Sequence, residues 1–543
     1  MRGQLAKGIS VSSTKTRATA KAAFMEALED RQLLATYYVS PYGNDAKSGT
    51  STTAAWKTIS RVNKQTLKAG DKVLFQGGKS FSGGLVVNSN EGGNSYTPVT
   101  FSTYGSGRAT INSGGVDGLK VLNTAGVHVA NLVLNGSGMS YNKTSGIYFG
   151  LTASGKKLAN VYIKNVEVKN YGARGIEFRI NGPGGSSISN VKIEDASVHH
   201  NLKGGIEAIS MKHNVNKNWT VRRVKAYENP GSKYINSEVT GSGIYLADID
   251  GGIIEHCIAY NNGVNGAAPV GIWVAGSNRI TIQYNESYNN KTRTSTDGGG
   301  IDLDWDTHNS TVQYNYTHGN YGPGILLCPA TNSGTYNTVR YNVSENDGRK
   351  NGTGGIQLYG NVQYAKIYNN VVFMSNANGS SAFRAHDLGA SGYVPKYTEV
   401  RNNIFYTTAA AKIINLTSGV ASKGSIKFYG NAYHATSGFK IQWGTSGYSS
   451  LTSWRSAKGQ EKLNGVSVGY QGDPKLVKAG YGGTVGNTAA LKTALTEYKL
   501  QSYSPLINRG VSQPGTLSAV KYDFFGGTSI MGGKYDIGVD EVK

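Results

Sequence analysis

The 543-residue sequence has few cysteines, few prolines and no long apolar run. Its two cysteines, Cys257 and Cys328, are too few for the disulfide framework that stabilises small secreted domains. No run of 18 apolar residues occurs, so no membrane-spanning helix is predicted. No Cys/His cluster has zinc spacing, and no glycine-rich segment leads from a strand into a helix as a phosphate-binding loop does. A disulfide scaffold, a zinc enzyme and a nucleotide-binding fold are therefore disfavoured.

Glycine and tyrosine are abundant instead, at 74 and 35 residues, and Asn-Gly, Gly-Gly and Ser-Gly pairs recur throughout. This composition is typical of a turn-rich all-β protein. The formal net charge of +22 would attract an acidic polysaccharide, an anionic membrane or a nucleic acid. The Lys and Arg residues are scattered, however, and a diffusely solvated basic surface explains them equally well. Nucleic-acid binding rests on charge alone and is not expected.

The N-terminus differs from the rest of the chain. Residues 1–23 are basic and rich in Ser, Thr and Ala, and "FMEALEDRQLLA" follows at 24–35. Composition alone predicts a short amphipathic helix there. The segment also resembles the "LExRxLL" leader found on many exported bacterial proteins. That resemblance implies that residues 1–35 are an export leader and that the protein is secreted or held at the cell surface.

A short phrase built around Gly-Ile recurs along the middle of the chain, as in "SGIYFG", "VGIWVA" and "GGIDLD". Its isoleucines lie 24 to 38 residues apart, at positions 147, 176, 206, 244, 272, 301, 325 and 356. Repeats of this length indicate a solenoid with loop insertions.

A second phrase carries an asparagine at one fixed place, at positions 285, 315, 342, 370 and 403. Stacked coils would bring these side chains into one buried column, where each amide bonds its neighbours and the turn backbone. We therefore expect a structural role for them rather than glycosylation. Cys257 falls in the same column, and Cys328 belongs to the other phrase about three coils away, so no disulfide is expected.

These features predict an all-β, right-handed parallel β-helix. The region from about 120 to 436 resembles the β-helix of the pectate-lyase-like superfamily, and residues 37–83 resemble the opening of its secreted members, with a capping helix near 56–67. The implied organisation is a leader (1–35), an N-terminal cap with the first coils (36–120), the β-helix (121–436) and a C-terminal capping region (437–543). Short helices are expected at 451–462 and 488–500. The superfamily contains lyases, hydrolases, epimerases and adhesins, so it does not select an activity.

In each Gly-Ile strand the isoleucine points inward and the next residue points outward. The outward positions form a face of carboxylates, aromatic rings and bases that suits a sugar polymer. The predicted substrate-binding residues are Tyr148, Glu177, Arg179, Glu207, Tyr245, Trp273, Gln357 and Tyr359. Arg384 and His386 follow in a less defined register.

The catalytic candidates are Asp302, Asp304 and Asp306, which alternate with apolar residues, and His308 just beyond them. Alternate residues of a strand lie about 6.6 Å apart, at the low edge of the range for the acid and base of an inverting glycosidase. Alternatively, the three aspartates could hold Ca²⁺, which would acidify a uronate for β-elimination by a nearby base. Asp297, in the preceding loop, could join the site.

The leading expectation is an exported, monomeric enzyme that degrades a polysaccharide, with a lyase acting on an acidic polysaccharide favoured by the resemblance and by the basic charge. An inverting glycoside hydrolase that uses paired aspartates is one alternative. A glycan-binding surface protein without catalysis is another.

Overall fold

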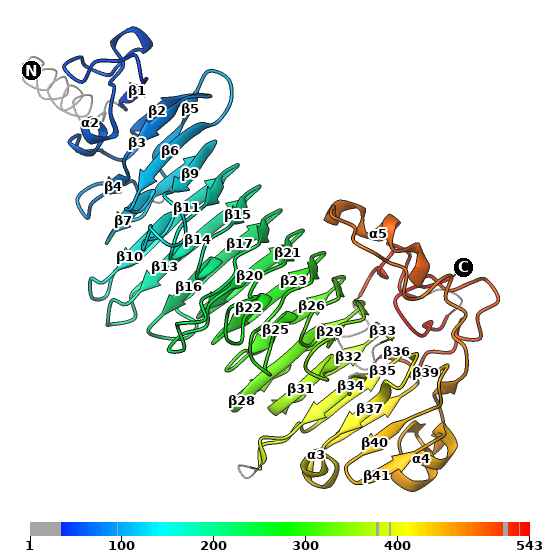
Figure 1. Cartoon of the computed structure of the whole chain (residues 1–543). Helices are drawn as coiled ribbons and strands as arrows, with labels where there is room; N and C mark the ends of the chain where they lie inside the picture. Colours follow the sequence, from blue (N-terminus) through cyan, green and yellow to red (C-terminus); the bar gives the residue numbers. More distant parts are fainter. Residues whose placement is uncertain are drawn as a thin grey trace, which may run out of the picture.

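The computed structural model describes residues 34–94, 96–375, 379–389, 392–513, 520–530 and 533–542. All but the last two residues of the expected leader lie outside this set. The described chain winds into a long parallel β-helix with three sheets along its length (Figure 1). Each sheet holds 14 strands, and successive coils contribute neighbouring strands to each sheet. The predicted all-β solenoid is confirmed.

Sheet A contains the strands β1 (Thr36–Val39), β2 (Lys72–Gln76), β5 (Val99–Tyr104), β8 (Val127–Ala130), β11 (Lys157–Lys164), β14 (Ser187–Glu194), β17 (Asn216–Arg222), β20 (Ile249–Glu255), β23 (Asn278–Gln283), β26 (Thr311–Gln313), β29 (Thr338–Arg340), β32 (Lys366–Tyr368), β35 (Thr398–Arg401) and β38 (Ile426–Tyr429). Sheet B contains β3 (Ser80–Ser82), β6 (Ala109–Gly114), β9 (Leu132–Gly136), β12 (Glu167–Lys169), β15 (Ser197–His199), β18 (Lys225–Tyr227), β21 (Ile258–Tyr260), β24 (Glu286–Tyr288), β27 (Tyr316–His318), β30 (Val343–Glu345), β33 (Val371–Met374), β36 (Ile404–Thr407), β39 (Ala432–Ala435) and β44 (Tyr470–Gln471). Sheet C contains β4 (Leu85–Val87), β7 (Leu119–Leu122), β10 (Ile147–Leu151), β13 (Arg174–Ile180), β16 (Gly204–Ser210), β19 (Ser242–Ala247), β22 (Val270–Ala275), β25 (Gly299–Asp304), β28 (Ile325–Thr335), β31 (Gly354–Gln363), β34 (Ser381–His386), β37 (Lys412–Leu416), β40 (Ile441–Trp443) and β41 (Ser446–Tyr448).

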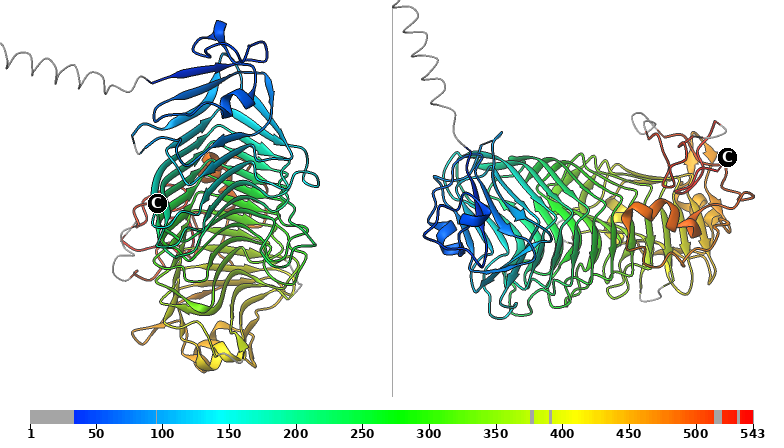
Figure 2. Two further views of the ribbon diagram at one scale, coloured as in Figure 1. Left: turned by 90° about the vertical axis from the view of Figure 1, so that its left-hand side faces the viewer. Right: turned by 90° about the horizontal axis from the view of Figure 1, so that it is seen from above.

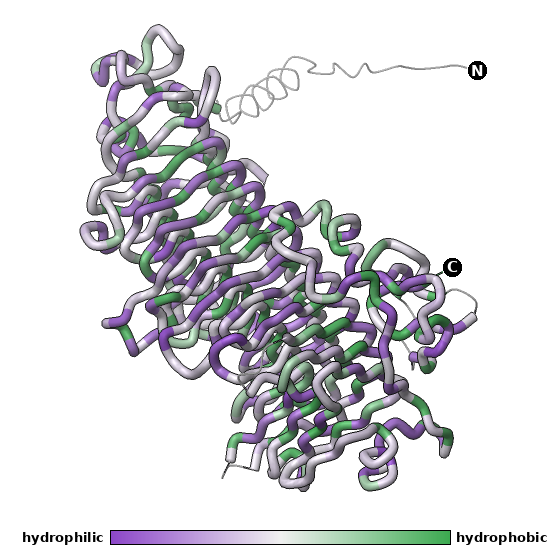
Figure 3. The backbone as a smooth tube through the Cα atoms, turned by 45° about the vertical axis from the view of Figure 1, so that its right-hand side comes forward, coloured by the Kyte–Doolittle hydropathy of each residue, from purple (hydrophilic) through white to green (hydrophobic). Residues whose placement is uncertain are grey.

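The interior is built from inward side chains that alternate with outward polar ones, and this alternation is visible along the coils in Figure 3. The isoleucines of the repeated phrase are buried, with exposed fractions of at most 1 %. The apolar residues at period two determine which face turns inward, and the few inward polar side chains, such as Ser287 and Thr317, form hydrogen bonds inside the coil.

The asparagine column predicted from the second phrase is confirmed. Each amide bonds the next coil, as in Asn285 to Asn315 (2.9 Å) and Asn315 to Asn342 (3.0 Å). Cys257 begins the column, because its backbone N–H donates to the Asn285 side chain at 2.8 Å. Both cysteines are free thiols.

A second buried ladder of the same kind was not anticipated. It connects successive coils at the turn between sheets B and C. Its members are Asn201, Asn229, Asn262, Asn290, Asn320 and Asp347.

Both ends of the solenoid are covered. At the N-terminal end, α2 (Ile59–Asn63) is shorter than the expected capping helix, and it follows the 3₁₀ turn η1 (Thr52–Ala54). At the C-terminal end, β40 pairs with β41 in antiparallel fashion, and α4 (Leu451–Lys458) buries Trp454 against the last coil. The short helix α3 (Ser418–Lys423) and the hairpin of β42 (Lys462–Leu463) and β43 (Val466–Ser467) complete this end.

The remaining C-terminal residues do not stay at the last coil. They run back along the outside of sheet B, where Figures 1 and 2 show them beside earlier coils. This segment contains η3 (Thr488–Ala490), α5 (Leu491–Ala494) and η4 (Thr496–Tyr498). Its backbone N–H groups at Gly482 and Val485 donate to Glu345 (3.0 Å) and Glu286 (2.7 Å) of the solenoid. Among the described residues, no helix has the length and apolar character needed to cross a membrane.

Candidate active site

The outward residues predicted from the repeat lie on sheet C in one continuous column. Strand pairing places them in direct register from β10 to β31, in the order Tyr148, Glu177, Glu207, Tyr245, Trp273, Asp302, Leu326 and Gln357. The second outward column is also in register where it can be followed, since Arg179 pairs with Gly150 and Asp304 pairs with Cys328. Different side chains pack against this column at different places along the solenoid.

Over β13 and β16 the column is occupied by an ion-pair network. Glu177 and Glu207 are 7 % and 6 % exposed, and Arg179 bonds them at 2.7 and 2.5 Å. Arg174 contacts Glu207 at 2.6 Å and Glu238, from the insertion before β19, at 2.7 Å. The charges of these side chains are neutralised by ion pairs within the network. The predicted role of Glu177, Arg179 and Glu207 in substrate binding is therefore not supported. The network instead ties the insertion to the sheet.

Sequence reasoning missed Arg174, although a signal existed. The residue two positions before the repeated isoleucine is small or apolar in the other coils, for example Ser145, Ser242 and Gly299, and Arg174 is the one charged residue in that series.

Tyr245 and Trp273 stack face to face, with ring centroids 3.6 Å apart and planes inclined by 3°. Their exposed fractions are only 6 % and 4 %, because Val239 and Trp305 pack over them. The expectation that they form an open platform for sugar rings is therefore wrong, since the rings bury each other. Tyr148, at the far end of the column, is half-buried beside Gly150.

The acidic strand keeps two of its three aspartates on the outer face. β25 ends at Asp304, and Asp306 lies in the following turn with a positive φ of 55°. Asp306 contacts His308 at 3.2 Å, and the other ring nitrogen of His308 bonds Thr335 at 2.8 Å. The expected row of three aspartates is thus broken by the turn, which separates Asp306 and His308 from the strand.

Asp302 and Asp304 form an acidic cluster with Asp297. Asp302 is 2 % exposed, and no described residue forms a hydrogen bond with its Oδ1 atom. Burial, with the charges of Asp304 and Asp297, raises the pKa of Asp302 well above its ordinary value. Burial and the Asp297 charge raise the pKa of Asp304 to about 7, and burial raises the pKa of Asp297 to about 7. Such carboxyl groups hold a proton near neutral pH and can deliver it.

The Ca²⁺ site expected at the three aspartates stays a prediction. Within the part of the chain that the structure describes, no group of three or more His, Cys, Asp or Glu side chains is arranged to hold a metal ion. Asp302, Asp304 and Asp306 do not share one site, because β25 ends at Asp304 and Asp306 lies in the following turn.

A pocket of about 300 Å³ lies beside the acidic cluster, over β28, β31 and β34. Asp297 and Cys328 are among its lining residues, and Cys328 pairs with Asp304 on the neighbouring strand. The remaining lining includes Leu326, Gln357, Tyr359, Arg384 and His386, with Ser295, Thr296, Pro323, Asn351 and Thr353 from the neighbouring turns. Gln357 and Tyr359 therefore lie where the sequence placed a binding face, and Arg384 and His386 join them.

Arg384 is the one arginine of this pocket. One guanidinium nitrogen donates to the Gly352 carbonyl, and among the described residues its buried Nε has no hydrogen-bond partner. Burial lowers the pKa of Arg384.

Comparison with known proteins agrees with this architecture. Residues 221–379 match a family model described as a right-handed β-helix region. Together with the parallel strand pairing of the described residues, this match identifies the fold as a right-handed parallel β-helix, as the sequence predicted.

Two relatives share an activity by name. A lacto-N-biosidase of Bifidobacterium longum subsp. longum is 26 % identical over 442 residues, covering 62 % of this chain and 27 % of that protein. The chain thus spans about a quarter of the length of this curated relative. A solved GH136 lacto-N-biosidase from Eubacterium ramulus is 18 % identical, with a TM-score of 0.50 over 76 % of this chain and 70 % of that one. Pectate lyase Pel9A is 15 % identical over 94 % of this chain and 96 % of its own, with a TM-score of 0.44.

Proposed function

We propose that this protein is a glycan-degrading enzyme, and that it acts as a glycoside hydrolase at the pocket beside Asp297, Asp302 and Asp304. The observation that carries the proposal is the pair of outward carboxyl groups on β25 with raised pKa values, one buried without a partner. Glycosidases use two carboxyl groups, one as an acid toward the leaving oxygen and the other as a base or nucleophile. The lacto-N-biosidase named above supports a hydrolase as well.

In this mechanism Asp302 is the general acid. Its burial favours the protonated form, so that it can give its proton to the glycosidic oxygen as the C–O bond breaks. Asp304, which accepts a hydrogen bond from the Trp305 backbone N–H at 2.8 Å, is more easily ionised and serves as the base or nucleophile. The negative charge of Asp297 helps to keep the pKa values of Asp302 and Asp304 raised. Gln357 and Tyr359 bind sugar hydroxyl groups.

A second candidate is the lyase favoured by the sequence. Arg384 is the observation that supports it, because a guanidinium with an unpartnered Nε can bind the carboxylate of a uronate. Neutralising that carboxylate acidifies the adjacent C–H, and an ionised Asp304 would remove the proton before the bond to the leaving sugar breaks.

Product analysis separates the two candidates. The full chain is incubated with a panel of neutral and uronate-containing oligosaccharides and polysaccharides, with and without a chelator. A hydrolase releases reducing sugars without a double bond, whereas a lyase releases an unsaturated uronide that absorbs in the ultraviolet. We expect saturated products from a neutral glycan. An absence of any product across the panel contradicts both candidates and favours a non-catalytic glycan-binding protein.

The substrate is thus a polysaccharide or oligosaccharide met outside the cell, and we propose that the chain is exported and acts as a monomer. The leader-like segment at 24–35 supports export. Detecting the protein in culture medium or on the cell surface, and losing it there when residues 28–34 are scrambled, tests this location.

A further inference from the structure

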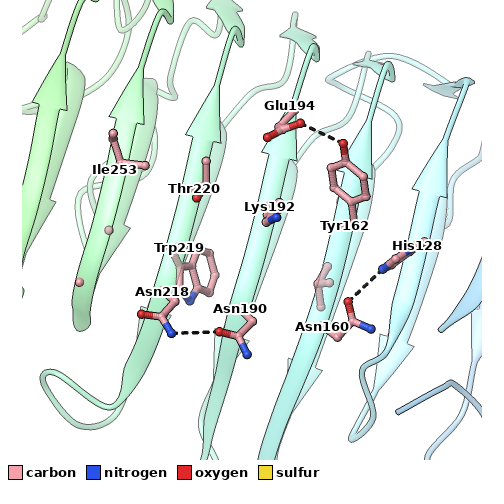
Figure 4. A pocket seen from close by; sticks show the side chains of 13 residues that line it. His128, Asn160, Tyr162, Asn190, Lys192, Glu194, Asn218, Trp219, Thr220 and Ile253 are labelled. Atoms are coloured by element: carbon pink, nitrogen blue, oxygen red, sulfur yellow. Dashed lines mark hydrogen bonds between the residues drawn. The ribbon is translucent and has the colours of Figure 1, made fainter. Parts of the chain in front are cut away.

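A second and larger cavity, of about 690 Å³, lies on a different face of the solenoid from the candidate active site. It extends over β8, β11, β14, β17 and β20 of sheet A, as Figure 4 shows. The active-site pocket lies on sheet C and on later coils. The two sites therefore share no lining residue.

This cavity is an open channel that follows a bend in sheet A. Each of the four long strands passes through one residue with positive φ, namely Asn160, Asn190, Asn218 and Gly251. The pairing continues on both sides of this position, as in Ala159 with Ser189 and Val161 with Val191. Asparagine and glycine tolerate this backbone conformation better than other residues do. The repeated bend therefore opens a channel parallel to the solenoid axis.

One wall of the channel is a straight column of outward side chains. His128, Tyr162, Lys192, Thr220 and Ile253 pair in direct register on five successive strands. Strands are about 4.8 Å apart, so the column is about 19 Å long. The other wall is the ladder of exposed amides, in which Asn218 donates to Asn190 at 3.1 Å. A straight, open channel of this length fits an extended polymer better than a compact ligand.

The hydrogen-bonding groups of the channel are only partly used. The bond between the two amides leaves an N–H of Asn190 and the side-chain oxygen of Asn218 without a bond among the described residues. The side chains of Lys192 and Thr220 likewise make no hydrogen bond within the described part of the chain. Unused donors on β14 and unused polar groups on β17 thus lie on neighbouring coils, where they can bind hydroxyl groups of a sugar chain.

The charge of the channel is nearly balanced. The lining contains one lysine, Lys192, and one glutamate, Glu194. The Glu194 carboxylate accepts a hydrogen bond from the Tyr162 hydroxyl at 2.9 Å and lies 3.9 Å from Arg222 and 3.8 Å from Arg223. His128 bonds Asn160 at 3.0 Å, and burial lowers its pKa, so it adds little charge near neutral pH. Among the lining residues there is no arginine. A polyanion would find one free cation beside a carboxylate, so an uncharged ligand fits better.

We propose that this channel is a second glycan-binding site, which holds an extended, uncharged oligosaccharide segment without cleaving it. It goes beyond the proposed hydrolase function, since it retains a glycan chain on the protein at a site remote from Asp302 and Asp304. The binding does not require that the active-site proposal be correct.

Calorimetric titration tests the proposal. The full chain carrying Asp302→Asn, which prevents turnover, is titrated with cellohexaose, xylohexaose and mannohexaose, and with hexagalacturonate as the anionic counterpart. We expect at least one neutral hexasaccharide to bind. Asn190→Gly with Asn218→Gly should weaken its binding at least tenfold, because glycine keeps the backbone bend, as Gly251 does, but removes the amides. Thr220→Trp should abolish binding by filling the channel.

Asn309→Gly is the matched control. Asn309 is an exposed asparagine with a φ of 50° on a later coil, and its amide donates to Asn278 at 2.9 Å, outside the channel. Its variant should bind as the parent does. The proposal is overturned if no neutral hexasaccharide binds, if hexagalacturonate alone binds, or if Thr220→Trp leaves the affinity unchanged. If a neutral hexasaccharide binds but the unaltered chain hydrolyses no glycan of the panel, the hydrolase is refuted and this site stands.

Discussion

Asp304 on β25 and Cys328 on β28 occupy paired positions on neighbouring coils, and the Asp304 carboxyl group accepts a hydrogen bond from the Trp305 backbone N–H at 2.8 Å. This bond opposes the effect of burial on Asp304, whereas Asp302 has no such partner at Oδ1. Two aspartates of one strand thus meet different environments, which is the arrangement that divides acid from base in a glycosidase. The relationship leads to the first prediction.

Asp302→Asn and Asp304→Asn should each lower kcat by about 10²–10⁴-fold, the usual contribution of one acid–base group. Both changes preserve shape, so the melting temperature should not fall. Steady-state rates on the glycan that the panel identifies measure the effect. Asp306→Asn is the matched control and should retain activity, because its carboxylate contacts His308 in the turn beyond the strand. Equal losses in all three variants would contradict the assignment.

Stability should depend on pH through the acidic cluster. Asp304 and Asp297 have pKa values of about 7 in the folded protein, above the unfolded value of about 4, so folding takes up protons between these limits. Their stabilising contribution is complete below pH 4 and is lost as the pH rises toward 7. Asp297→Asn and Asp304→Asn should therefore raise the melting temperature at pH 8 by roughly 2 °C or more and flatten its decline between pH 5 and 8. A steeper decline in the variants would refute the raised pKa values.

Trp273→Ala should destabilise the protein rather than only weaken glycan binding. Trp273 is 4 % exposed and stacks on Tyr245, and its Nε1 donates to Ser242 at 3.0 Å. Removing a buried tryptophan costs about 3–5 kcal/mol. Thermal or chemical unfolding measures this loss, and Tyr336→Ala, at an exposed tyrosine, is the control. A variant of wild-type stability that no longer binds glycan would restore the platform expected from the sequence.

Asn342→Ala should break the buried ladder. Its amide donates to Val312, Arg340 and Asn370 at 2.9 Å each, and every buried group left unpaired costs about 1–3 kcal/mol. We expect a lower melting temperature than for Asn309→Ala, whose amide is on the surface. Equal stability of the two variants would mean that the ladder adds nothing beyond the packing of the coil.

Neither cysteine should react rapidly with a thiol reagent in the folded protein. Burial raises the pKa of Cys257 to about 12, and burial beside the aspartates raises that of Cys328 well above its ordinary value. The thiolate is the reactive form, so labelling at neutral pH should be slow. We expect two labelled thiols only after denaturation. Fast modification of Cys328 in the folded state would show that the pocket is open at this thiol and that the thiol is ionised.

Local patterns in the sequence were sufficient for the fold and for much of the register. The repeated Gly-Ile phrase determined which residues point inward, and the asparagine column followed from its position in the second phrase. These predictions hold because each coil obeys the same short-range alternation, and stacking then copies the register to the next coil. Asp302, Asp304, Gln357 and Tyr359 were placed on the outer face for this reason.

The sequence alone therefore determined the solenoid, one of its two buried asparagine columns and the direction of the residues in the Gly-Ile strands. Only the tertiary structure decided which outward residues remain available to a ligand. Glu238 and Val239 come from an insertion whose path no repeat specifies, and they close the network around Glu207 and the rings of Tyr245 and Trp273. A single backbone turn at Asp306 separated one aspartate from the other two. Alternation gives the side of the sheet on which a residue lies, but burial depends on contacts between segments far apart in the chain.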